Sequence, residues 1–294
     1  MILGILIGVI AALLLGIIIR GVHLAIEFKG GTLLSYSYAG DIATSEVESV
    51  VKGVVPDTSV TVRTGESLST GGKEMTVSFT AKEGLSVDKQ HQITEDLKAA
   101  FPNQNLELTD SNDVSPSSGR EFLLKCLIAV IFAAFVVVVY IAFRFRKIGG
   151  WSAGVCSVFA LIHDILVALA ATIIFGFEFN SNIVAVILTI LGYSINNTIV
   201  IYDRIRENRS LMPNASLNEL INTGCSQSLT RSIRTSITTI GTMLIVSIVV
   251  FISGYNSLLS FSVPLMFGLI SGTYSSLFVA PVTWSWWKNK ENRK

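Results

Sequence analysis

Six runs of apolar residues divide the chain, and each is long enough to cross a membrane as a helix. A spanning helix needs about 20 residues for about 30 Å of hydrocarbon. The first run has no basic lead and no small-residue cleavage pattern, so we expect a retained helix rather than a secretory signal. The runs are residues 2–19, 122–143, 153–175, 183–202, 233–252 and 261–283. We therefore predict a polytopic α-helical membrane protein with six transmembrane helices.

The long polar stretch after the first run, residues 21–119, has the pattern of an α+β domain. Apolar and polar residues alternate in its strand-like segments, and apolar residues recur at helical spacing in the others. The predicted strands are 32–38, 59–64, 74–80 and one starting near Leu106, the predicted helices are 45–55 and 86–101, and a Gly/Ser-rich turn covers 68–72. The order β-α-β-β-α-β is that of a ferredoxin-like domain. Residues 110–119 are expected to be a flexible linker on which this domain swings.

Charge is segregated along the chain, although the formal net charge is only +1. Residues 24–118 contain fourteen acids and seven bases, a net charge of −7, and bases follow the second, fourth and sixth apolar runs. The positive-inside rule then predicts cytoplasmic N- and C-termini. The predicted units are a first helix (1–20), an external domain (21–119) and a five-helix bundle with a cytoplasmic tail (120–294). Because the bases lie in short loops and the tail, they indicate how the helices are oriented in the membrane, and they argue against nucleic acid as a partner.

Catalytic and metal-binding residue patterns are missing from the sequence. His23 and His91 are lone residues, whereas metal sites need several converging ligands. The three cysteines lie in or next to apolar runs without metal-ligand spacing, which is typical of packing residues. We therefore expect no enzyme activity, no metal and no cofactor.

The costliest polar pair in an apolar run is His163 and Asp164, about ten residues into the third run. An aspartate at the centre of a membrane helix costs about 2.5 to 3.5 kcal/mol on insertion scales, so Asp164 should face the bundle interior with a partner. A carboxylate beside an imidazole suits a proton relay. A buried pair that only locks helices together is the alternative.

The fourth run ends in residues 192–209, GYSINNTIVIYDRIRENR, which pass from apolar surroundings to dense charge. Ser194, Asn196, Asn197 and Thr198 form a polar cluster that is either a functional site or the contact between packed helices. The charged part that follows is expected to anchor the helix in the cytoplasm. Its residues are Asp203, Arg204, Arg206, Glu207 and Asn208.

Two arginines, Arg231 and Arg234, open the fifth apolar run. Both have stems long enough to reach the membrane surface. If Arg231 instead faces the bundle, its fixed positive charge would tune a nearby carboxylate or amide.

Several stretches, in this order, resemble the SecD/SecF family of protein-export membrane proteins, within the resistance-nodulation-division (RND) permease superfamily. They cover almost the whole chain, and the fourth is the longest. They are AIEFKGGT at 25–32 (with Glu27, Phe28, Gly30 and Gly31), VSPSSGREF at 114–122, ALIHDI at 160–165, GYSINNTIVIYDRIREN at 192–208 and TRSIRTSITT at 230–239. The resemblance implies six spans with one external domain after the first.

The resemblance also implies a role and partners. Members promote the late stage of protein export across the bacterial cytoplasmic membrane, using the proton gradient, or sodium in some relatives. The implied partners are SecD, the SecYEG channel, the translocating precursor polypeptide and membrane lipid. The implied ion-coupling residues are Asp164, His163, Asn196, Asn197, Thr198 and Arg231.

The chain departs from the family pattern at three places. Asn197 stands where the family usually has an aspartate, and an amide cannot carry a proton. Coupling must then use Asp164 or a carboxylate on SecD, or Asn197 coordinates an ion or orients water. Glu27 stands where the family tends to have aspartate, and the sequence opens directly in its first span, which suggests a truncated or re-annotated start.

Three other functions are open. An exporter of small lipophilic solutes would usually have two external domains and twelve spans in one chain. An intramembrane hydrolase built on His163 and Asp164 would need a nucleophile beside an oriented base. A non-coupling scaffold for SecD is the third, and Asn197 favours it.

Overall fold

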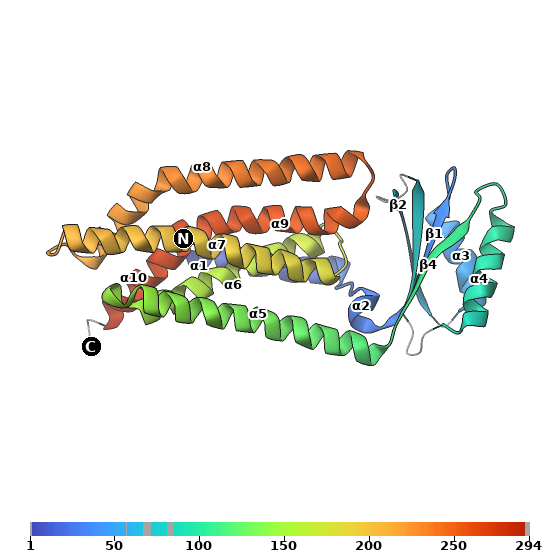
Figure 1. The fold of residues 1–294 in the computed structure, drawn as a ribbon, viewed down its shortest axis with the longest axis horizontal. Helices are drawn as coiled ribbons and strands as arrows, with labels where there is room; N and C mark the ends of the chain where they lie inside the picture. The colour runs from blue at the N-terminus through green and yellow to red at the C-terminus, as the bar shows by residue number, and fades with distance from the viewer. Residues whose placement is uncertain (1, 57, 67–71, 81–84, 292–294) are drawn as a thin grey trace.

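The computed structural model describes residues 2–56, 58–66, 72–80 and 85–291. A long helical bundle forms one end of the molecule and a four-stranded sheet with two helices forms the other (Figure 1). Helix α1 (Ile2–Arg20) runs from the middle of the bundle toward the sheet side, and α10 (Ala280–Glu291) ends at the end of the bundle that is remote from the sheet (Figure 1). All but residue 72 of the predicted turn at 68–72 lies outside the described residues.

Among the described residues, five apolar helical segments of the bundle are long enough to cross a membrane. They are α5 (Pro116–Arg144), α6 (Gly150–Ile174), α7 (Ser181–Leu211), α8 (Leu217–Ile252) and the segment Leu258–Glu291. The last combines α9 (Asn256–Tyr274), the π-helical turn η2 (Ser275–Val279) and α10 (Ala280–Glu291). A sixth apolar helix, α1 (Ile2–Arg20), corresponds to the first predicted run and is shorter than these.

The bundle is organised around α6 and the α9–α10 segment. In the most apolar 18-residue stretch of each helix, 56% of α6 and 61% of the α9–α10 segment is buried inside the molecule. The buried share is only 11% for α5 and 17% for α8. The outer faces of α5 and α8 therefore present apolar side chains to whatever surrounds the bundle, as a lipid-facing or partner-facing surface requires.

The sheet domain has the strand and helix order that the sequence pattern predicts. Its elements are β1 (Gly31–Tyr38), α3 (Thr44–Val54), β2 (Ser59–Glu66), β3 (Lys73–Thr80), α4 (Val87–Ala100) and β4 (Glu107–Val114). The strands lie in the order β2-β3-β1-β4, and every neighbouring pair is antiparallel. Both helices cover the face that points away from the bundle (Figure 1).

The core of this domain joins the inward side chains of the strands to one face of each helix. Val47 and Val51 of α3 and Ile93 and Leu97 of α4 are fully buried against Tyr36 and its neighbours in the sheet. In each helix the two buried residues are four apart, which is the spacing of one helix face. The sequence therefore specified which side of each helix is buried.

The prediction of a flexible linker at residues 110–119 is wrong. Asp110 to Val114 belong to β4, where Asp110 pairs with Ser35 and Val114 with Gly31 of β1. Helix α5 already begins at Pro116, and the Ser115 side chain caps it by accepting the amide hydrogen of Ser118. The polar composition of this stretch suggested a loop. It forms a strand because backbone hydrogen bonds to β1 stabilise it, and an edge strand such as β4 can expose polar side chains.

Candidate functional site

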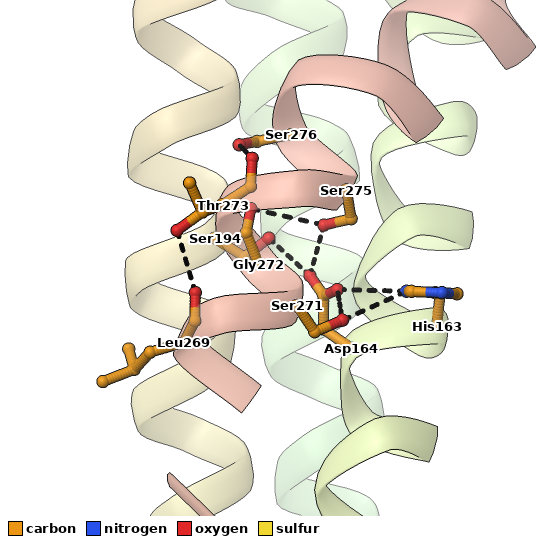
Figure 2. A network of polar contacts seen from close by, with 9 residues as sticks. All are labelled: His163, Asp164, Ser194, Leu269, Ser271, Gly272, Thr273, Ser275 and Ser276. Carbon is orange, nitrogen blue, oxygen red and sulfur yellow. Dashed lines mark hydrogen bonds and ion pairs between the residues drawn. The ribbon is translucent and has the colours of Figure 1, made fainter. Parts of the chain in front are cut away.

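Asp164 is the centre of a buried polar network in the bundle. Its side chain is completely buried near the middle of α6. Oδ2 accepts hydrogen bonds from Ser194 Oγ at 2.7 Å and from Ser275 Oγ at 2.6 Å, and Oδ1 accepts one from Ser271 Oγ at 2.6 Å (Figure 2). Three hydroxyl donors around one carboxylate satisfy its ionised form, which only accepts hydrogen bonds.

Three different elements carry these serines. Ser194 belongs to α7, Ser271 to α9, and Ser275 opens the π-helical turn η2. Ser271 and Ser275 are four residues apart, so helical pitch places both on the face of this segment that meets α6. A π-helical turn inside a helix is often found at a functional site. The carboxylate therefore joins α6, α7 and the α9–α10 segment through polar contacts.

His163 lies at the edge of the same network. Its Nδ1 is 3.3 Å from Asp164 Oδ1 and 3.2 Å from Ser271 Oγ. Its Nε2 is buried without a hydrogen-bond partner among the described residues, as is the hydroxyl of Tyr274, whose ring centroid is 6.2 Å from that of His163. Asp164 thus faces the bundle interior with partners, as expected for an aspartate in an apolar run, and His163 is buried beside it.

This arrangement has a definite chemical consequence. A protonated Asp164 would donate a hydrogen bond, which either one of the three hydroxyls that now donate to it or Nδ1 of His163 would have to accept. Hydroxyl hydrogens rotate freely. The network can therefore take two hydrogen-bond patterns that differ by one proton.

The three remaining residues of the predicted cluster on α7 have different surroundings. Asn196 is exposed, and the structure does not bring it into the site. Asn197 is buried, and its Nδ2 has no hydrogen-bond partner among the described residues. Thr198 is buried and donates to the Ser194 carbonyl of its own helix at 3.0 Å. Asn197 and Ser194 are three residues apart and so lie on neighbouring parts of one helix face.

Arg231 does not face the interior of this bundle. The buried residues of α8 in this region are Ser228, Ser232 and Ser236, which recur every four residues, while Arg231 is exposed. It lines an open cavity of about 610 Å³ with Arg204 and Gln227. Arg231 therefore does not provide a positive charge to the buried network around Asp164 within this chain.

The charged end of α7 ties three helices together at the end remote from the sheet. The Asp203 carboxylate lies 3.0 Å from Arg144 at the end of α5, and 2.8 Å from Arg206. Gln227 of α8 accepts hydrogen bonds from Arg204 at 2.7 Å and from the buried Asn208 at 2.9 Å. Glu207 pairs with Arg204 at 2.6 Å within α7. These predicted anchor residues thus make a polar cluster between helices.

The motif after the first apolar helix forms a junction between the sheet domain and the bundle. It contains α2 (Ile26–Lys29) and leads directly into β1. The Glu27 carboxylate accepts the backbone N–H of Ser181, at the start of α7, with an oxygen–nitrogen distance of 2.6 Å. Phe28 is buried and its ring stacks on that of Phe122 in α5, with the centroids 5.7 Å apart. The motif therefore contacts both α5 and α7.

Two glycines of this motif have backbone conformations that other residues rarely adopt. Gly30 has φ = 84°, and a Cβ there would lie 2.6 Å from the Pro116 backbone. Gly31 has φ = 143°, and a Cβ there would lie 1.9 Å from the carbonyl oxygen of Phe79. No side chain fits at either place, so the two glycines allow β1 to enter the sheet immediately beside the start of α5.

Further contacts join the sheet domain to the loop before α7. His23 and Ala25 exchange backbone hydrogen bonds with Phe179, at 2.8 and 2.9 Å. Arg63 of β2 forms an ion pair with Glu178 at 3.0 Å. The short segment 23–31 is thus held to the ends of two membrane helices, while it also carries the first strand of the sheet.

Ser271 and Ser275 are not among the residues predicted from the sequence, and Ser194 is predicted only as one member of its cluster. The signal for the first two was present as small polar residues at helical spacing inside an apolar run, SGTYSS at 271–276. Within the described residues, no group of three or more His, Cys, Asp or Glu side chains is placed to hold a metal ion.

Comparison with known proteins places these features in a family. The family described as protein export membrane protein SecD/SecF, C-terminal, matches residues 92–290. The protein translocase subunit SecF of Helicobacter pylori is 31% identical over 280 residues, which is 95% of this chain and 82% of that protein. That of Rhodothermus marinus is 33% identical over 276 residues, covering 91% of this chain and 84% of that protein.

Solved structures give the same result. The crystal structure of SecDF, a translocon-associated membrane protein from Thermus thermophilus, matches 97% of this chain with a TM-score of 0.75 and 27% identity. SecDF in a super-membrane-facing form matches with a TM-score of 0.64 and 28% identity. This chain covers 37% and 38% of those SecDF chains. The chain is therefore a multi-pass membrane protein that belongs to the SecD/SecF family of protein-export membrane proteins.

Proposed function

We propose that this chain is the SecF-type subunit of a SecD–SecF unit that promotes late-stage export of precursor polypeptides from the SecYEG channel. The single observation that carries the coupling part is the buried Asp164 with its three hydroxyl donors. A carboxylate inside a membrane is costly, and such groups are typical of ion pathways. In this proposal, protons moving down their gradient, or sodium ions as in some relatives, change the charge at Asp164 and drive the export cycle.

The proposed membrane arrangement has six spans, with α1 added to the five longer segments. The bases Arg144, Arg204 and Lys288 lie in the last turns of α5, α7 and α10, and these three helices end on the side of the bundle remote from the sheet domain. The positive-inside rule then favours a bacterial cytoplasmic membrane with both termini in the cytoplasm. Residues 21–119 form the external domain, and 120–294 form the five-helix part of the bundle. The strand order β2-β3-β1-β4 supports a ferredoxin-like domain.

Movement at Asp164 reaches the external domain through the junction at residues 23–31. Ser194, which donates to Asp164, lies on α7, and Glu27 binds the first turn of that helix. A change in the donors of Asp164 would shift α7 relative to α6, and the junction would pass the shift to β1.

Export in vesicles that contain SecYEG, SecD and this chain tests the proposal. Late-stage release of a precursor should depend on the proton gradient, and Asp164→Asn should lower it to the level seen with a protonophore. Thr189→Val is the matched control, because Thr189 is an exposed hydroxyl on α7 that bonds only its own helix. Release in Asp164→Asn that still responds fully to the gradient would contradict the role of Asp164.

Asn197→Asp provides a second arm of this experiment. The family usually has a carboxylate at this position, and Asn197 is buried three residues from Ser194. If coupling is weakened here by the amide, Asn197→Asp should increase the release driven by the gradient. If a carboxylate on SecD already serves, this substitution should leave release unchanged while Asp164→Asn still lowers it.

A non-coupling scaffold is the second candidate, and one observation favours it. The hydrogen bonds described for the Asp164 carboxylate all come from side chains of the bundle, as expected for a residue that only holds helices together. A scaffold predicts that Asp164→Asn weakens the folded chain or its assembly with SecD without changing the response of release to the gradient. Measuring SecD co-purification beside release separates the two functions.

A further inference from the structure

A cavity at the end of the bundle remote from the sheet domain is not used by the coupling site. It has a volume of about 600 Å³ and lies between the end of α5, the start of α6 and α10. Its charged lining residues are Arg146, Lys288 and Glu291, and its main aromatic residues are Phe143, Trp151 and Trp287. We propose that this cavity binds the headgroup phosphate of an anionic phospholipid in the leaflet at this end of the bundle.

The positions of the tryptophans indicate where this cavity lies relative to the membrane surface. All four tryptophans of the chain are at this end, at the start of α6 and in α10. Tryptophan is enriched at the membrane–water interface, where its ring reaches the headgroup level. Trp151 is 68% exposed and Trp287 is 43% exposed, so both present apolar surface next to the cavity. The cavity is therefore at the depth of phospholipid headgroups.

Positive groups converge on this cavity from three elements. A Cβ at Gly149, just before α6, would lie 2.8 Å from Cε of Lys288, so the lysine stem lies directly over this turn. Its ammonium is thereby held near the first turn of α6, whose free N–H groups and dipole also attract anions. Arg146 adds a guanidinium, which suits phosphate geometry.

The lining carries an excess positive charge. Glu291 pairs with Lys288 at 2.6 Å, which leaves Arg146 as the lining cation with no ion-pair partner among the described residues. Its guanidinium lies 5.9 Å from the centroid of the Phe143 ring, at the mouth of the cavity. A phosphate between Arg146 and the first turn of α6 would complement this charge, and the exposed Phe143 and Trp151 would contact the glycerol and upper acyl chains.

The test uses the full chain purified in detergent and the Arg146→Gln variant. Bound lipid is counted by native mass spectrometry after titration with dioleoylphosphatidylglycerol or dioleoylphosphatidylcholine. The wild-type chain should retain the anionic lipid in preference. Arg146→Gln should reduce that preference about fivefold, since one Lys or Arg near an anionic surface contributes about that factor. Lys288→Gln should reduce it in the same direction.

Arg209→Gln is the matched control, because Arg209 is an exposed base at the same end of the bundle, outside this cavity. It should keep the wild-type preference. Equal losses in Arg146→Gln and Arg209→Gln would overturn the proposal, since they would indicate general attraction to the surface. So would the absence of any preference, or displacement of the lipid by millimolar inorganic phosphate, which would make the site one for free phosphate.

Discussion

Glu27 stabilises the start of α7, and removing its carboxylate should loosen that turn selectively. Its Oε2 lies 2.6 Å from the Ser181 nitrogen, and the Asn180 side chain caps the next amide, that of Asn182, at 3.1 Å. A hydrogen bond to a charged group contributes about 1.5 to 3 kcal/mol, and loss of a helix cap costs about 0.5 to 2 kcal/mol. Because Glu27 is partly exposed, we expect Glu27→Ala to lower the local stability at the start of α7 by about 1.5 kcal/mol.

Hydrogen exchange of the full chain in detergent measures this effect directly. A loss of about 1.4 kcal/mol corresponds to about tenfold faster exchange, so the amides of residues 181–184 should lose about tenfold protection. Glu178→Gln is the matched control, because Glu178 lies in the loop just before α7 but pairs with Arg63 instead of a backbone amide of α7. Unchanged protection at these amides in Glu27→Ala, or an equal loss in Glu178→Gln, would refute this role of Glu27.

Two other predictions concern packing and pH. Gly119→Ala should lower the free energy of unfolding by about 1 to 3 kcal/mol, because the new Cβ would lie 3.0 Å from the Phe28 backbone. Gly192→Ala is the control, because a Cβ there would have no other atom within 4 Å, and it should leave the free energy of unfolding unchanged. Thermal unfolding of the two variants measures the difference. Burial raises the pKa of Tyr36 in the sheet domain above its usual value near 10, so the folded state favours the neutral phenol. Its contribution to stability is therefore complete below about pH 10 and falls as the pH rises further. Tyr36→Phe should weaken that alkaline dependence, and unfolding in denaturant at pH 8 and above 10 checks it.

Much of the architecture follows from patterns that a single element carries. Apolar runs marked the bundle helices, and helical spacing at Val47 and Ile93 marked the inner faces of the domain helices. The cost of an aspartate in an apolar run identified Asp164 as a residue that needs partners. Each of these properties depends on neighbours in sequence, so the sequence alone is sufficient to predict them.

The parts that sequence could not supply depend on contacts between distant segments. Ser271 is 107 residues from Asp164, and only the packing of α9 on α6 shows that they meet. Asp110 was assigned to a linker because its surroundings are polar, whereas pairing with β1 makes it part of a strand. The exposed side of Arg231 depends on the pitch of α8, which begins at Leu217, well before the apolar run.

The most direct test of the coupling proposal is the protonation state of Asp164 in the membrane. Infrared difference spectra would be recorded from vesicles that contain this chain and SecD, before and after a proton gradient is imposed. The account predicts a carboxylic acid signal that appears with the gradient, disappears in Asp164→Asn and shifts in Ser275→Ala, which removes one donor. A signal that is unchanged in Asp164→Asn, or the absence of any gradient-dependent carboxyl signal, would contradict it.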